Sequence, residues 1–408
     1  MEAKKLVNNK ISTHTVFSSK WIYFWIIILS IPVFYFSAFD EGYLKNEAAL
    51  GQEIWAPADT LSVWGISKAQ PFGNRLLFKY VVTETASAIS PDSNKGLYNT
   101  YVVISYIFFL ATVLTFYYLI RINGYGKKLS LLGLVLFMMS PTVLMAYKLP
   151  THLREDFMVY FLVVTGLIAL NKKSDFLLLL VFFLGPLCRE TFLIFPFSYL
   201  FFTNFHSVKK RILYSSIPVS ISIAIRLYFG VVDYDMFEGL RWTMSHPGES
   251  IAFILITFHL MWVILFAYFA AGKKLRSQST FFDKSILPVV LLIFLTTFVG
   301  GIFKESRLLF LAFPWVIMIT LKTISSDRHL ELKTWFNKSS VKLFLLFQPI
   351  LILLFVGAFT QIDITTTFVY KIPYVQWSVL TILYAESMLF VFIHYFPLFK
   401  SRLVSLFR

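Results

Sequence analysis

Apolar runs long enough to cross a lipid bilayer recur along the whole chain, and they constrain its fold more than any other feature. A helix needs about 20 apolar residues to cross roughly 30 Å of hydrocarbon. Hydrophobic residues make up 57% of the sequence and charged residues only 14%, unlike in soluble domains. The runs lie at 21–38, 98–120, 129–147, 157–170, 176–188, 191–203, 212–230, 251–271, 286–303, 308–321, 343–360 and 378–397.

These runs predict an all-α fold, because only helices and closed barrels satisfy every backbone hydrogen bond inside a membrane. We expect a polytopic transmembrane bundle of about 10–12 spans. It should form one integral membrane domain over residues 1–408, with no soluble domain. The runs within 176–203 are short, so they are predicted to form a broken or half-length pair of helices.

The distribution of basic residues predicts the orientation in the membrane. Lys and Arg concentrate in cytoplasmic loops. With both termini placed in the cytoplasm, the inner segments hold 24 of the 37 basic residues and 5 of the 22 acidic ones. This concentration indicates contact with anionic membrane lipids and no binding of nucleic acid, despite the net charge of +15. The inner segments are 1–20, 121–128, 171–175, 204–211, 272–285, 322–342 and 398–408.

The first outer loop, residues 39–97, is the longest polar stretch. Loops of this length are uncommon unless they are functional or disordered, and the apolar content here argues against disorder. The spacing of Leu76, Leu77, Tyr80 and Val81 favours a short amphipathic helix that lies in the membrane interface.

Adjacent carboxylates, Asp40 and Glu41, directly follow the first apolar run on the predicted outer side. Carboxylates in this position can deprotonate an acceptor hydroxyl, and their oxygens suit a divalent cation such as Mg²⁺ or Mn²⁺. The chain has no His/Cys pair with zinc-ligand spacing and no glycine-rich phosphate loop. Chemistry at this face would therefore depend on carboxylates and cations. Candidate substrate-binding residues on the same side are Arg75, His152, Arg154, Arg189, Glu190, Lys304, Glu305 and Arg307.

Arg189 and Glu190 carry the strongest physical argument among these residues. Each side of the pair has only a half-length apolar run, so the pair is expected partway through the bilayer. Charges at this depth cost about 2.5–3.5 kcal/mol each and persist mainly where they line an interior cavity. The alternative is a mutual Arg189–Glu190 ion pair that only locks two helices.

Two other charged turns have both a functional and a structural interpretation. Lys304 and Arg307 could bind a phosphate group, or they could extend to the headgroup region as interfacial cations. In the stretch His152–Asp156, the acids could cap a helix start and favour its dipole, or they could belong to the site.

The arrangement resembles the GT-C superfamily of polytopic glycosyltransferases. Asp40-Glu41 occupies the place of that family's modified DxD motif, and the turns at Arg189-Glu190-Thr191 and Glu305-Ser306-Arg307 resemble motifs of bacterial members. The chain has no large C-terminal outer domain, so the resemblance implies a minimal form with a lipid-linked or cell-surface glycan acceptor. It also implies a location in the bacterial inner membrane.

The resemblance implies an inverting transfer of a hexosyl or pentosyl group from a polyprenyl-phosphate donor. Asp40 would be the general base, and Glu41 would support it or help to hold the cation. Four cations would neutralise the departing phosphate: Arg75, Arg189, Lys304 and Arg307.

Two other functions remain open from the sequence. A polymerase or ligase of lipid-linked oligosaccharides would use the same outer cations without needing Asp40. A transporter or flippase would use Arg189 and Glu190 as a mid-membrane substrate pair.

The predicted topology can be tested with cysteines introduced at Ser62 and Ser279. A membrane-impermeant thiol reagent should label the two positions from opposite sides of the membrane. Labelling of both from one side would contradict the topology and the outward-facing site.

Overall fold

The computed structural model describes residues 20–38, 76–89, 94–144, 156–229, 237–245, 247–270, 280–300 and 306–326. Every regular element within these ranges is a helix, which confirms the all-α class for this part of the chain. Within these ranges, two segments, Asn99–Ile122 and Phe281–Val299, are long and apolar enough to cross a membrane. The number of spans stays a prediction, and the runs 343–360 and 378–397 lie outside the described residues.

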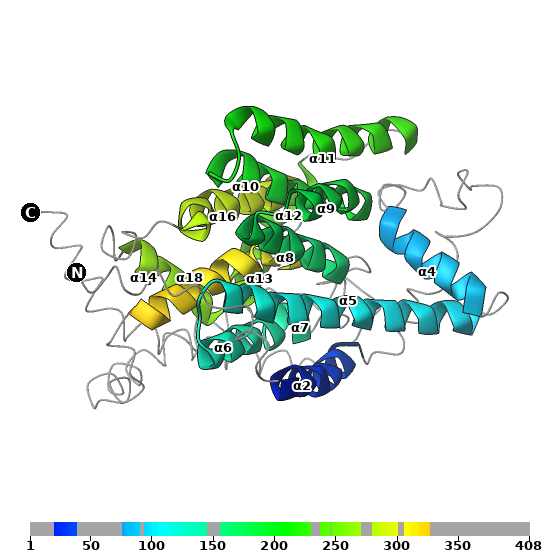
Figure 1. Ribbon diagram of the computed structural model, residues 1–408, viewed down its shortest axis with the longest axis horizontal. Coiled ribbons are helices and arrows are strands. Elements are labelled where there is room, and N and C mark those ends of the chain that lie inside the picture. Colours follow the sequence, from blue (N-terminus) through cyan, green and yellow to red (C-terminus); the bar gives the residue numbers. More distant parts are fainter. Residues whose placement is uncertain are drawn as a thin grey trace, which may run out of the picture.

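The helices pack against one another, and α5, in the middle of Figure 1, lies against α2, α4, α6 and α8. In chain order they are α2 (Lys20–Ala38), α4 (Leu76–Ile89), α5 (Asn94–Ile122), α6 (Lys127–Met138), α7 (Pro141–Leu144), α8 (Asp156–Lys172), α9 (Asp175–Cys188), the 3-10 helix η4 (Glu190–Leu193), α10 (Ile194–Phe202), α11 (Val208–Phe229), α12 (Glu238–Ser245), α13 (Pro247–Phe258), α14 (Leu260–Ala270), α16 (Phe281–Gly300), α17 (Ser306–Phe310) and α18 (Phe313–Ser326).

Several predicted runs are interrupted in the structure. The run 129–147 is divided between α6 and α7, and the run 308–321 between α17 and α18. The run 251–271 is divided between α13 and α14 at His259, which has a positive φ of 37°. Hydropathy alone did not predict these breaks, nor did it predict α12.

The half-length pair within 176–203 is a hairpin of two short antiparallel limbs. Phe182 on α9 packs edge-on against both Phe195 and Tyr199 on α10. The chain reverses at Arg189, whose extended backbone separates α9 from η4. The prediction of a half-length pair is confirmed, and 176–203 contains two helical limbs.

Polar contacts join the three predicted inner loops 121–128, 171–175 and 204–211 at one end of the bundle. Asn171 Nδ2 donates a hydrogen bond to Asn123 Oδ1 at 3.3 Å. Asp175 lies 2.5 Å from Lys210 Nζ and 2.7 Å from His206 Nε2. The hydrogen bond from Lys210 lowers the pKa of the Asp175 carboxyl, so this carboxyl is ionised at neutral pH.

The other two inner loops with described residues meet at this end as well. Lys322 Nζ lies 2.6 Å from Asp283 Oδ2, which joins the end of α18 to the start of α16. The Tyr125 hydroxyl donates to the Met318 carbonyl at 3.2 Å and connects α18 to the turn before α6. The described parts of these five predicted inner loops therefore lie at one end of the bundle.

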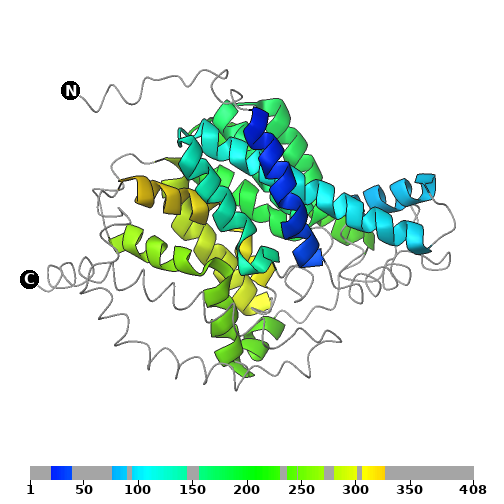
Figure 2. The ribbon, with the colours of Figure 1, turned by 90° about the horizontal axis from the view of Figure 1, so that it is seen from below.

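The predicted helix of the first outer loop is present as α4. Its buried side chains are Leu76, Phe78, Val82 and Ala86, and Phe78 packs against Tyr101 of α5. α4 lies beside α5 (Figure 2). Of the four residues that predicted this helix, Leu76 is buried, Leu77 and Val81 are partly buried and pack against the core, and Tyr80 is exposed. The position of α4 in a membrane interface stays a prediction.

Tight packing at Gly185 closes the hairpin. A side-chain β-carbon at this position would overlap the ring of Phe192, which is fully buried. Only glycine lets η4 fold this closely against α9, and η4 directly follows Arg189. The backbone contact therefore helps to fix where Arg189 lies.

Gly185→Ala should destabilise the protein by about 1–3 kcal/mol, because the added β-carbon would overlap the ring of the fully buried Phe192. Gly126→Ala is the matched control, since its added β-carbon meets nothing within 4 Å; it should cost less than about 1 kcal/mol. Thermal unfolding in detergent, followed by tryptophan fluorescence, measures both. Equal midpoints for the two variants would contradict the close contact.

Candidate functional site

Three charged residues from separate parts of the chain meet near the opposite end of these helices. Asp156 is the first residue of α8, Arg189 connects α9 to η4, and Arg307 is the second residue of α17. All three were expected on the outer side. The three residues are hereafter called the Asp156 cluster.

The Asp156 carboxylate contacts both arginines, each through a different oxygen. Arg189 Nη1 donates a hydrogen bond to Oδ1. Arg307 Nε lies 3.7 Å from Oδ2, which is within ion-pair range but too long for a hydrogen bond. One carboxylate thus bridges two guanidinium groups that are far apart in sequence.

The cluster is almost completely removed from solvent. Asp156, Arg189 and Arg307 are 3%, 2% and 3% exposed. Burial of a charge is costly unless a partner of opposite charge accompanies it. Since two cations share one anion, the three residues together carry an excess positive charge.

Tyr160, one helical turn after Asp156, fixes the backbone next to Arg307. Its hydroxyl donates to the Arg307 carbonyl at 3.2 Å, and its ring packs against Phe310 and Phe313. Thr112 of α5 donates to the Phe157 carbonyl at 3.0 Å and so anchors the first turn of α8. Rigid helices therefore determine the positions of both Asp156 and Arg307.

Glu190 does not form an ion pair with its neighbour Arg189. Arg189 pairs with Asp156, so the hypothesis of an Arg189–Glu190 ion pair was wrong. The Glu190 side chain is partly buried, and its Oε2 atom is buried without a hydrogen-bond partner. The expectation of burial is confirmed for Arg189 and holds only in part for Glu190.

The structure brings together two of the predicted site residues, Arg189 and Arg307. No group of three potential metal ligands occurs among the residues that the structure describes. The predicted catalytic and metal-binding carboxylates and five predicted substrate-binding residues lie outside those residues: Asp40, Glu41, Arg75, His152, Arg154, Lys304 and Glu305.

Sequence reasoning underestimated Asp156 and missed Tyr160. The acids at 155–156 were equally compatible with a helix cap, because acidic residues commonly begin helices. Tyr160 lies inside an apolar run, where nothing in the sequence distinguishes it from a core aromatic. Only the packing of α8 against α17 reveals both roles.

Comparison with known proteins finds no matching family model, no matching curated protein and no matching solved structure.

Because Arg189 pairs with Asp156, two isosteric substitutions should have very different effects on the free energy of unfolding. Asp156→Asn should destabilise the protein by about 3–5 kcal/mol, because it removes the charge that pairs with two buried cations. Glu190→Gln should change stability by less than about 1 kcal/mol, since Glu190 forms no ion pair with Arg189. Thermal unfolding of the purified variants measures both. A larger loss of stability in Glu190→Gln than in Asp156→Asn would support an Arg189–Glu190 ion pair instead.

Proposed function

We propose that the protein is a polytopic membrane glycosyltransferase of the bacterial inner membrane, with both termini in the cytoplasm. It transfers a sugar from a polyprenyl-phosphate donor to a lipid-linked or cell-surface glycan acceptor on the outer face. Three features support the proposal: the apolar outer surface of the bundle, the depth of the Asp156 cluster and the chemistry of its arginines.

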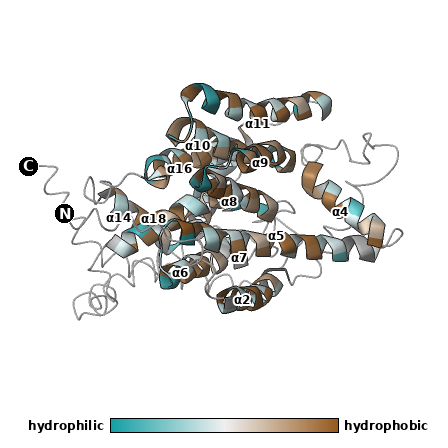
Figure 3. Ribbon diagram, in the orientation of Figure 1, coloured by the Kyte–Doolittle hydropathy of each residue, from teal (hydrophilic) through white to brown (hydrophobic). Residues whose placement is uncertain are grey.

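Exposed apolar side chains follow helical spacing on the outside of the bundle. On α16, Leu287, Leu291 and Leu295 are about half exposed and occur every fourth residue. Water-soluble monomers rarely expose continuous apolar surfaces of this kind, whereas lipid chains would cover them. Figure 3 shows long hydrophobic stretches on α2, α5 and α9.

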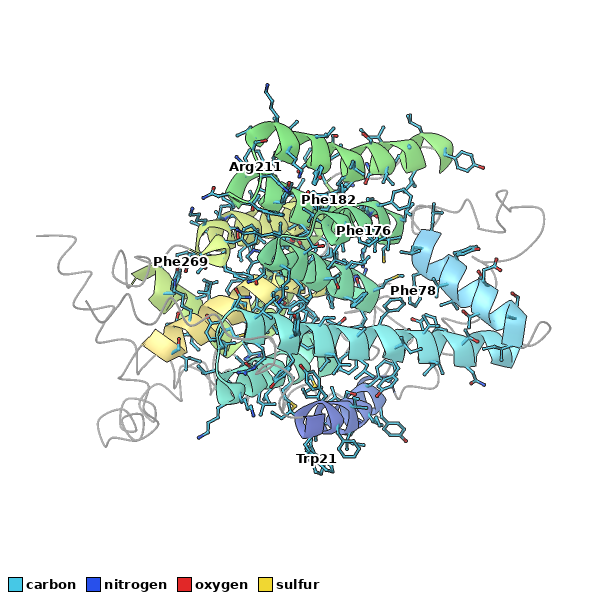
Figure 4. The ribbon with its side chains drawn as sticks, viewed as in Figure 1. Trp21, Phe78, Phe176, Phe182, Arg211 and Phe269 are labelled. Carbon is cyan, nitrogen blue, oxygen red and sulfur yellow. The ribbon has the colours of Figure 1, made fainter. Side chains whose placement is uncertain are left out.

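The same pattern occurs on other helices at the outside of the bundle. Trp21 on α2 is 72% exposed and points away from the other helices (Figure 4). Phe176 on α9 and Leu227 on α11 are exposed to a similar degree. A membrane around the bundle would bury these residues and remove the cost of exposing them to water.

Helix lengths support a position of the Asp156 cluster inside the hydrocarbon layer of such a membrane. From the end where the inner loops meet, α8 has 17 residues and α9 has 14. At 1.5 Å per residue they reach about 20–25 Å, which is less than the roughly 30 Å of hydrocarbon. Ionisable residues at this depth are costly and usually mark a substrate pathway.

The single observation that carries the proposal is the meeting of Arg189 and Arg307 around one carboxylate. The guanidinium group presents several N–H donors in a planar fork that matches phosphate oxygens. In a water-poor site, positive groups aimed at a departing phosphate stabilise its developing charge strongly. We assign this role to the two arginines, with Arg75 and Lys304 as further phosphate-binding cations.

The remaining predicted site residues complete the proposed reaction. Asp40 takes the proton from the acceptor hydroxyl as the sugar bond to the phosphate breaks. Glu41 supports Asp40 or helps to hold a divalent cation. His152, Arg154, Glu190 and Glu305 contact the substrates.

Reconstituted vesicles with a panel of polyprenyl-phosphate sugars test this assignment. Asp40→Asn should abolish sugar transfer with little effect on expression, because an amide cannot accept a proton at neutral pH. Arg307→Gln should lower turnover about 100-fold through loss of charge stabilisation. Arg226→Gln is the control, because this arginine is exposed on α11 and should retain activity.

Other results of this assay would favour the other functions. Full activity of Asp40→Asn together with loss in Arg307→Gln favours a polymerase or ligase that works through its arginines. A wild-type protein that leaves every donor chemically unchanged but moves it between leaflets is a flippase.

A further inference from the structure

The ion pairs of Asp156 differ in their number of cations from the Asp283–Lys322 ion pair at the opposite end of the bundle. Asp283 pairs with one cation, Lys322, and accepts further hydrogen bonds from Tyr268 and Thr280. Those contacts balance one negative charge with one positive charge. Asp156 instead contacts two arginines, which come from separate parts of the chain.

Two guanidinium groups in a water-poor interior repel each other unless an anion lies between them. Arg189 and Arg307 come from segments more than 100 residues apart, and no local backbone geometry could bring them together. The carboxylate of Asp156 meets both of them, with one oxygen for each. Their mutual orientation therefore depends on where this carboxylate lies.

The carboxylate itself is held by rigid elements. Asp156 is the first residue of α8, and a hydrogen bond from Thr112 of α5 holds the first turn of this helix. A hydrogen bond from Tyr160, also on α8, holds the backbone of Arg307. An error of about 1 Å in the position of a binding group can cost a factor of a hundred in rate. Two arginines that bind one phosphate group must be held in fixed positions, and these hydrogen bonds help to hold them there.

We propose that Asp156 is a positioning residue that orients Arg189 and Arg307 to bind the phosphate group of a lipid phosphate ester. The residue acts through the two arginines and does not contact the reacting atoms. This inference rests on the proposed function, because it takes the arginines to be the phosphate-binding groups. A purely structural ion pair would stabilise the fold without affecting affinity for phosphate.

Binding of farnesyl phosphate to the full-length protein in lipid nanodiscs tests the inference, with farnesol as the uncharged comparison. The dissociation constant is measured for the folded fraction by calorimetry, and thermal unfolding is followed in parallel. Wild-type protein should prefer the phosphate ester, and Arg189→Gln and Arg307→Gln should each lose that preference.

Asp156→Asn should raise the dissociation constant for farnesyl phosphate at least about tenfold, because the two arginines separate, and leave farnesol binding unchanged. Asp156→Glu keeps the charge but moves it by one methylene group, so it should fold and raise the constant about threefold. Asp283→Asn is the matched control: it breaks a buried ion pair at the other end and should lower stability alone.

Each other outcome has a separate meaning. Unchanged phosphate affinity in both Asp156 variants, with only a lower unfolding midpoint, would reduce Asp156 to a structural role. Tighter binding in Asp156→Asn would identify the carboxylate as a competitor of the phosphate and also overturn the proposal. If wild-type protein binds farnesyl phosphate no better than farnesol, the phosphate assignment of the proposed function fails first.

Discussion

The ion pairs of Asp156 with Arg189 and Arg307 link three parts of the bundle that are distant in sequence. The carboxylate offsets part of the desolvation and mutual repulsion of two buried guanidinium groups, both of which oppose folding. The surrounding helices hold Asp156, Arg189 and Arg307 in contact. The hairpin of α9 and α10 presents Arg189, α17 presents Arg307, and α8 connects them through Asp156 and Tyr160.

The helix ends divide the polar residues into two groups with different partners. At one end, which is rich in basic residues, short loops are joined by ion pairs such as Asp175 with Lys210 and Asp283 with Lys322. Near the other end, the Asp156 cluster has more positive than negative charge. The ion pairs at the first end stabilise helix ends, whereas the two guanidinium groups held around Asp156 have donors that match phosphate oxygens, and this chemistry underlies the functional proposal.

The short limbs of the hairpin determine how deep the cluster lies. Because α9 has only 14 residues, Arg189 lies only about 20 Å from the end where the inner loops meet. Gly185 permits the close contact with Phe192 that turns the chain at this depth. A longer limb would place Arg189 near water, where a cation is easily hydrated and gives little electrostatic stabilisation to a phosphate.

The sequence by itself determined the helical class, most of the helix positions and the half-length pair at 176–203, because apolar run length and local breaks decide these features. It also identified Arg189 and Arg307 as unusual, since charges next to apolar runs are costly. Only the tertiary structure decided that Arg189 pairs with Asp156 and not with its neighbour Glu190, and that α4 buries Phe78 and Val82. Both outcomes depend on which helices pack together. Such contacts join residues far apart in the chain, and hydropathy carries no information about them.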